Sequence, residues 1–124
     1  MPRKQYFDQL VSPFSHWHRE KHDGISYFDL DCVGVCPACA KPLFLADTIY
    51  NKDFTFRGKS AWQQRPYVYL AQAADICFYE FFYTVDESTQ FRDIIRFDIH
   101  RIYPHSDKKW SNLSPDQMLQ FLEH

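Results

Sequence analysis

Glycine is scarce in this sequence, with only three residues in a chain of 124. A glycine-rich phosphate-binding loop is therefore excluded, and no serine lies in the GxSxG motif of acyl-transfer hydrolases. Disorder and low complexity are also disfavoured, because hydrophobic residues make up 45% of the chain and aromatic residues 19%. We therefore expect a single compact domain that spans residues 1–124.

Long apolar runs are also absent. No stretch approaches the ~20 residues that a membrane-spanning helix needs, and the first residues lack the apolar segment of a signal peptide. This pattern favours an intracellular, cytoplasmic protein without membrane contact. A strong charge of one sign is missing too, since the formal net charge is -2, and overall charge gives no general attraction to nucleic acid. Residues 52–65 carry a local positive excess, which either meets a phosphate-bearing partner or is a solvated loop and helix start.

Only one pair of the four cysteines has the spacing of a metal-binding motif, namely Cys36 and Cys39 in the sequence CPAC. This spacing is typical of one half of a structural Zn²⁺ site. The sequence holds no second CxxC or CxxH motif that would complete four ligands, so a plain turn between two strands is the alternative. Because disulfides are rare inside cells, we expect the four cysteines to be buried thiols or metal ligands, and Cys77 or a histidine of the first helix would have to complete a zinc site.

The spacing of apolar residues predicts elements in the order helix, strand, strand, helix, strand, strand, helix. They span about residues 3–21, 25–36, 43–50, 60–74, 77–85, 91–103 and 115–123. Ser60 and Ser114 are predicted N-caps, whereas Pro66 conflicts with its helix unless that helix begins near Arg65. The central strand–helix–strand crossover implies a mixed sheet. We therefore predict an α/β (α+β) fold with a single mixed four-stranded sheet flanked by helices.

Two carboxylates, Asp31 and Asp47, lie in the apolar segments on either side of CPAC. A charged side chain is costly to bury unless a cation, a proton or a metal ion compensates it. Two converging strand carboxylates therefore favour a divalent ion. Glu80 also lies in an apolar strand, but a partner such as Arg96 would make it structural, and we leave it outside the predicted site.

The element order, together with Asp31, Asp47 and the CxxC turn between them, resembles the PD-(D/E)xK nuclease superfamily and its restriction-endonuclease-like core. It is similar in particular to small phage or prophage proteins of that type, and the resemblance spans about residues 5–103. It implies that Asp31 is the first motif aspartate and Asp47 the acidic residue of the (D/E)xK element. It further implies that Glu20 is an additional helical carboxylate. These residues would hold Mg²⁺ or Mn²⁺, which activates water against a phosphodiester.

The chain departs from the motif at Ile49, which occupies the position of the motif lysine. Lysine there would orient the water and stabilise charge on the phosphate, whereas isoleucine can do neither. Lys52, Lys59 or Gln63 could replace it from the following segment, and we predict Lys59 as the catalytic cation.

Three functions follow as alternatives. The first is a metal-dependent nuclease that cleaves DNA or RNA with Asp31, Asp47 and Lys59. The second is a catalytically inactive protein of the same fold, phage-encoded, that binds and inhibits a host or defence protein through its aromatic surface. The third is a small interaction module stabilised by Zn²⁺ at Cys36 and Cys39. The sequence leaves the oligomeric state open.

Overall fold

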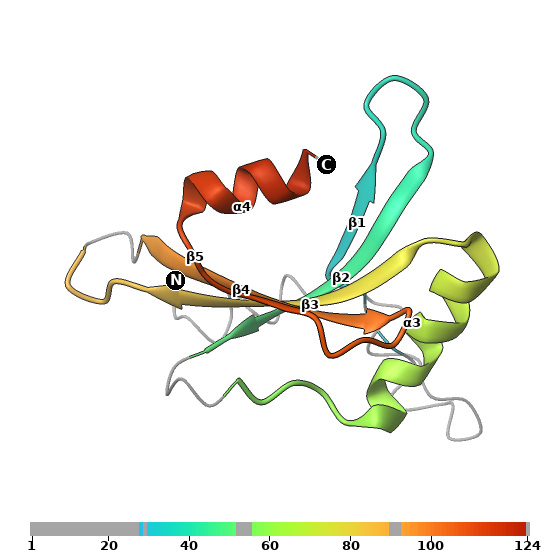
Figure 1. Cartoon of the computed structure of the whole chain (residues 1–124), viewed down its shortest axis with the longest axis horizontal. Coiled ribbons are helices and arrows are strands. Elements are labelled where there is room, and N and C mark those ends of the chain that lie inside the picture. Colours follow the sequence, from blue (N-terminus) through green and yellow to red (C-terminus); the bar gives the residue numbers. More distant parts are fainter. Residues whose placement is uncertain (1–27, 29, 52–55, 90–92, 124) are drawn as a thin grey trace, which may run out of the picture.

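The computed structural model describes residues 28, 30–51, 56–89 and 93–123. Its elements are β1 (Cys32–Val35), β2 (Pro42–Tyr50), α3 (Ala61–Ala74), β3 (Cys77–Val85), β4 (Ile94–Tyr103), β5 (Lys109–Leu113) and α4 (Pro115–Leu122). The predicted first helix, with Glu20, lies outside the described residues, as does Lys52. The described part is an α+β fold built on one mixed sheet (Figure 1).

The five strands of this sheet lie side by side in chain order, from β1 to β5. Strands β2 and β3 are parallel, and every other neighbouring pair is antiparallel. Parallel neighbours need a long crossover connection, which the segment with α3 provides. The predicted mixed sheet with a strand–helix–strand crossover is therefore confirmed.

The sheet has five strands, so the prediction of four is wrong, and β5 is the strand that the sequence pattern missed. Its sequence KWSNL has little intrinsic strand preference and places Asn112 in the left-handed backbone region, with φ 56°. Long-range contacts hold it beside β4 instead. The Asn112 amide donates a hydrogen bond to Asp98 Oδ1 (2.9 Å), and the Trp110 ring packs on Phe121 with centroids 5.0 Å apart.

The first strand is shorter than the predicted range 25–36, because β1 covers only Cys32–Val35. Residues 25–27 lie outside the described part of the chain. Phe28 and Leu30 are described, and they pack against the buried cluster around Tyr67 instead of extending the strand. The apolar side chains of Phe28 and Leu30 therefore pack against α3.

Helix α3 begins where its cap predicts. The Ser60 side chain accepts a hydrogen bond from the Gln63 amide, and the Gln63 side chain accepts one from the Ser60 amide. Pro66 lies inside the helix, so the alternative start near Arg65 is wrong. Tyr67 and Ala71, about one turn apart and both after Pro66, are buried against the sheet and hold this half of the helix in place.

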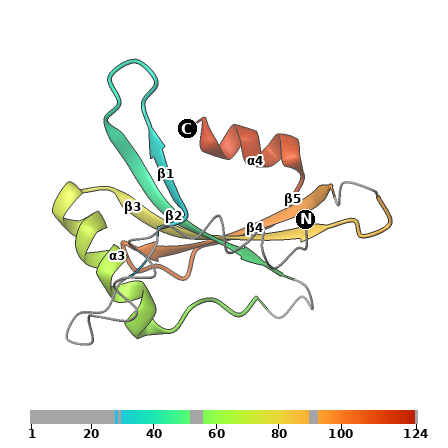
Figure 2. The same ribbon diagram turned by 180° about the vertical axis from the view of Figure 1, so that it is seen from behind.

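The two helices cover opposite faces of the sheet (Figures 1 and 2). On the face under α3, here called the α3 face, Leu45, Tyr67, Ala71 and Phe78 form one buried cluster. On the opposite face, called the α4 face, the second cluster joins Ala46, Phe81, Ile99 and Met118. Alternation along β2 therefore puts Asp47 on the α3 face with Leu45. No helix in the described ranges is long and apolar enough to cross a membrane.

Candidate functional site

Asp47 is a charged residue in the middle of the sheet, and its exposed fraction is 0%. Its Oδ2 meets the Lys59 ammonium, and no other well-aligned hydrogen bond to either oxygen is found among the described residues. The Lys59 ammonium Nζ lies 3.3 Å from Asp47 Oδ2 and forms an ion pair with it. Burial raises the pKa of Asp47; the Lys59 charge lowers it, and the Asp31 charge raises it further. Asp47 is thus a buried acid with one cationic neighbour and free coordination capacity.

Glu80 lies directly opposite Asp47 in the parallel register of β2 and β3. It is also buried, with an exposed fraction of 2%, and its Oε2 accepts a hydrogen bond from the Lys59 amide at 2.8 Å. Burial raises the pKa of Glu80, while hydrogen bonds from the Lys59 amide and the Gln64 side chain lower it. We call Asp47, Lys59 and Glu80 the Asp47 cluster, in which Lys59 binds one acid through its side chain and the other through its backbone.

Glu80 is the member of this cluster that the sequence prediction left out. Arg96, suggested as its partner, instead forms a two-pronged contact with Asp98, at 2.8 and 2.9 Å. Glu80 carries the same sequence signal that selected Asp47, because each is an acid within an apolar strand. What the sequence did not supply was the parallel register that places the two acids side by side.

Asp31 lies beside the Asp47 cluster but makes different contacts. It directly precedes β1, whose first residue Cys32 pairs with Ala46, and its side chain is exposed. The Asp31 Oδ2 accepts hydrogen bonds from the Thr48 amide at 2.9 Å and the Thr48 hydroxyl at 3.3 Å. The Asp31 charge raises the pKa of Asp47, and a hydrogen bond from the Asp31 backbone lowers it, both less than burial and Lys59 change it. Asp31 just before β1, Asp47 in β2 and Glu80 in β3 therefore form an acidic row across this side of the sheet.

The segment before α3 positions Lys59. Its Phe56 ring packs against Phe82, with centroids 6.0 Å apart, and the Phe56 amide donates a hydrogen bond to Asn51 Oδ1 at 3.0 Å. Gly58 then passes so close to Glu80 that a Cβ at this position would overlap its carboxylate. The lack of a side chain at Gly58 is what allows the Lys59 amide to reach Glu80.

Replacing Gly58 with alanine is expected to destabilise the protein by about 1–3 kcal/mol, because the new methyl group must displace a buried, hydrogen-bonded carboxylate. Urea unfolding measures this loss. The double variant Gly58→Ala/Glu80→Ala serves as the control, since it removes the atoms that clash. If Gly58→Ala costs as much in the Glu80→Ala background as in the natural chain, the close approach to Glu80 is not the cause.

The donor chemistry of this acidic row suits a hard divalent cation. Mg²⁺ and Mn²⁺ prefer oxygen ligands, and the buried Asp47 carboxylate has no close partner in the described ranges besides the Lys59 ammonium. No cluster of three or more His, Cys, Asp or Glu side chains in the described part is already gathered closely enough to hold a metal ion. A bound ion would therefore require the side chains of Asp31 or Glu80 to turn toward Asp47.

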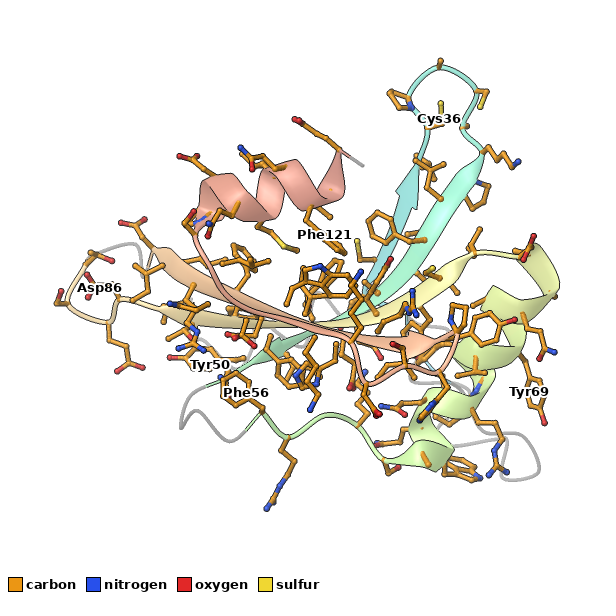
Figure 3. All side chains as sticks on the ribbon, viewed as in Figure 1. Cys36, Tyr50, Phe56, Tyr69, Asp86 and Phe121 are labelled. Carbon is orange, nitrogen blue, oxygen red and sulfur yellow. The ribbon has the colours of Figure 1, made fainter. Side chains whose placement is uncertain are left out.

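The CPAC turn forms the tip of the β1–β2 hairpin, where Figure 3 labels Cys36. The Cys36 amide donates a hydrogen bond to the Lys41 carbonyl (2.9 Å), and the Ala40 amide donates one to the Cys36 carbonyl (2.7 Å). Hydrogen bonds from the backbone amides of Cys39 and Ala38 lower the pKa of the Cys36 thiol. Both thiols of the motif are free, and Cys39 is exposed.

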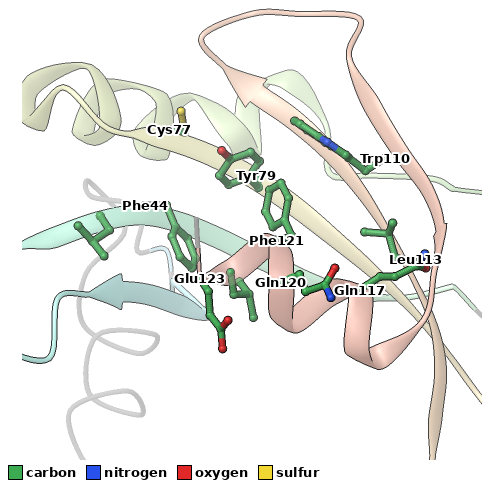
Figure 4. Close-up of a pocket in the computed structure, with 11 residues that line it drawn as sticks. Phe44, Cys77, Tyr79, Trp110, Leu113, Gln117, Gln120, Phe121 and Glu123 are labelled. Atoms are coloured by element: carbon green, nitrogen blue, oxygen red, sulfur yellow. The ribbon is translucent and has the colours of Figure 1, made fainter.

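A groove of about 820 Å³ lies on the α4 face, between α4 and the sheet. Figure 4 shows that aromatic rings from several elements line it, among them Phe44, Tyr79, Trp110 and Phe121. Phe121 contacts both Tyr79 and Trp110, with ring centroids 5.4 and 5.0 Å apart. The groove is thus on the opposite side of the sheet from Asp47.

Comparisons of the chain with models of known protein families, with curated proteins and with solved structures found no match. The case for a function therefore rests on the chemistry of these residues.

Proposed function

We propose that this protein is a nuclease-like phosphodiesterase that uses a divalent metal ion held at Asp47. The observation that carries this proposal is a fully buried carboxylate, compensated by one partly exposed lysine at 3.3 Å, beside a second buried acid. Burying a carboxylate lowers the stability of the fold unless a cation compensates its charge. Binding a cation is the function that suits an acidic row of this kind.

Asp47 would be the central ligand of Mg²⁺ or Mn²⁺, with Asp31 and Glu80 as the neighbouring oxygen donors. When bound, the ion would supply activation of water and stabilisation of charge on the phosphate. The main chain contributes by fixing the donors: Asp47 and Glu80 are register partners in adjacent strands, so their backbones cannot separate without breaking the sheet. Rigid strands are suitable supports for such ligands.

We assign to Lys59 the role that the lysine of the (D/E)xK motif would have. Ile49 occupies the motif position, while the Lys59 ammonium reaches Asp47 at 3.3 Å from the segment that precedes α3. A cation at this distance from the acid can hold a water molecule and stabilise negative charge that develops on a phosphate. Because the Lys59 side chain is 32% exposed, it can also contact a substrate that arrives from solvent.

The substrate that we propose is a nucleic acid, DNA or RNA. An acidic row repels phosphates unless positive charge surrounds it. Two exposed arginines, Arg57 and Arg65, flank Lys59 in the chain and supply that charge. Their guanidinium groups suit phosphate contacts in any sequence context, so we expect backbone contacts to dominate binding.

The test is cleavage of a plasmid and of single-stranded oligonucleotides with Mg²⁺ or Mn²⁺. Asp47→Asn is expected to reduce cleavage by about 100-fold or more, since it removes the charge of the central ligand. Asp75→Asn is the matched control, because Asp75 is exposed and its left-handed backbone (φ 56°) suits asparagine equally well. Unchanged cleavage by Asp47→Asn would remove this assignment, as would a natural chain that cleaves nothing with either metal.

The aromatic groove on the α4 face favours a second candidate, a catalytically inactive protein of this shape that binds and inhibits a host or defence protein. A groove of about 820 Å³ with several aromatic side chains is the type of surface that anchors a protein partner. This alternative predicts no metal-dependent cleavage and a stable complex in a pull-down. Trp110→Ala should then weaken capture, whereas Asp47→Asn should not.

A further inference from the structure

The tip of the β1–β2 hairpin carries two thiols that are organised as one half of a metal site. Cys36 and Cys39 have CxxC spacing, and the Ala40 amide donates a hydrogen bond to the Cys36 carbonyl at 2.7 Å, which closes the turn between them. Ala40, directly after the second cysteine, has a left-handed backbone with φ 61°, which turns the chain back toward β2. This arrangement places both sulfurs on the same tight turn, where a soft cation such as Zn²⁺ can bridge them.

Two thiolates leave a tetrahedral Zn²⁺ ion with two open positions. The other two cysteines do not fill them. Cys32 is part of the packing on the α4 face, and Cys77 begins β3, where its side chain interacts with Tyr79. No third His, Cys, Asp or Glu in the described ranges stands with the pair in a metal-binding arrangement. The remaining ligands therefore come from outside the described ranges or from another molecule.

We propose that two copies of this chain bind one Zn²⁺ ion between their hairpin tips, each copy supplying the thiolates of Cys36 and Cys39. A tetrahedral ion with two ligands from each side fits a two-fold axis, which is the commonest symmetry of protein dimers. The hairpin reaches beyond the rest of the sheet in both ribbon views, so two tips can meet without collision of the two sheets (Figures 1 and 2).

Charge and exposed apolar area at the hairpin favour a second copy as the occupant. Lys41 is the sole charged residue between residues 33 and 46. One Zn²⁺ with four thiolates carries a charge of about -2, and two Lys41 side chains, one from each copy, would offset it. Val33, Val35 and Leu43 are 46%, 47% and 51% exposed on this hairpin. A second hairpin would cover part of this area, which adds to the metal bonds.

The full chain, kept reduced, is to be titrated with Zn²⁺ while its zinc content and molar mass in solution are measured. We expect about one zinc per two chains and a doubling of mass that a chelator reverses. Cys36→Ser and Cys39→Ser should each abolish both changes, and Cys77→Ala should change neither. Because the tip is exposed, the two serine variants should keep the melting temperature of the metal-free natural chain.

Several outcomes would overturn the proposal. One zinc bound per monomer would show that a single chain completes the site. A dimer that forms equally without zinc, or with Cys39→Ser, would show that the thiols do not hold the copies together. Absence of zinc binding by the reduced chain would remove the site altogether. Substitution of Co²⁺ for Zn²⁺ gives an independent measurement, since the visible absorption of tetrahedral Co²⁺ with four thiolates appears only if both pairs bind the same ion.

Discussion

Replacing Lys59 with methionine is expected to reduce phosphodiester cleavage by about 100- to 1,000-fold, the usual loss when one preorganised charge donor is removed. Methionine keeps much of the side-chain length but cannot bind a phosphate oxygen or hold a water molecule through a charge. Arg57→Met is the matched comparison, because Arg57 is an exposed cation two residues away that would attract phosphate, whereas the ion pair with Asp47 found in the described ranges belongs to Lys59. Equal losses in the two variants would mean that Lys59 contributes only to the general attraction of the substrate.

The same substitution is expected to destabilise the fold, because it leaves Asp47 buried without its cation. Breaking a buried ion pair costs about 3–5 kcal/mol, and we expect the lower end because the Lys59 side chain is 32% exposed. Urea unfolding of the natural chain and of Lys59→Met measures the difference. The double variant Asp47→Asn/Lys59→Met should recover part of the loss, since no buried charge is then left unpaired.

The loss of folding stability in Lys59→Met should also depend on pH. Burial already raises the pKa of Asp47 above its ordinary value of 3.8, and removal of the positive charge would raise it further. Between the pKa of Asp47 in the unfolded chain and its raised pKa in the folded chain, the folded state binds more protons than the unfolded state. The free energy of unfolding therefore falls as the pH rises through the raised pKa. The variant should therefore lose more stability at about pH 8 than at about pH 5. A loss independent of pH would mean that Asp47 does not carry the effect.

The second large effect is expected for Phe82→Ala, which should lower the free energy of unfolding by about 3–5 kcal/mol. Phe82 has an exposed fraction of 0%, and its ring packs against His100 and Phe56, with centroids 4.6 and 6.0 Å away. Its removal leaves a cavity and also frees Phe56, which anchors the segment that carries Lys59. We therefore expect Phe82→Ala to lose activity as well as stability.

Leu70→Ala is the control for this substitution. Leu70 lies on α3 and is 56% exposed, so its truncation should change the unfolding free energy by no more than about 0.5 kcal/mol. Urea unfolding compares the two variants under the same conditions. A loss below about 1 kcal/mol for Phe82→Ala would contradict the packing described for this part of the sheet.

Elements with strong local signals were predicted closely from the sequence. Strand β3 has the predicted bounds Cys77–Val85, because its aromatic and β-branched residues favour a strand and an Asp-Ile pair separates it from α3. Helix α4 begins at Pro115 after its Ser114 cap, also as predicted. Strand β5 was missed because its position depends on Asp98, a residue far from it in the chain.

In the candidate site too, local properties could be predicted from the sequence and long-range contacts could not. The burial cost of a carboxylate in an apolar strand is a local property, which is why Asp47 could be selected from the sequence. The contact between Lys59 and Asp47 depends on where the α3 crossover begins, and Glu80 depends on the parallel register of β2 and β3. These are long-range properties that no local pattern contains. The catalytic roles of Asp31, Asp47 and Lys59, and the metal ligand Glu20, stay predictions.

The Lys59–Asp47 ion pair has a consequence for metal supply. A divalent ion would have to compete with an ammonium group that is tethered to the same chain and so present at a high effective concentration. The fold thus carries a counter-ion of its own for Asp47. If the proposed function holds, metal occupancy would rise when the ion is abundant or when a phosphate-bearing substrate attracts the lysine away, and metal loading would then be coupled to the arrival of substrate.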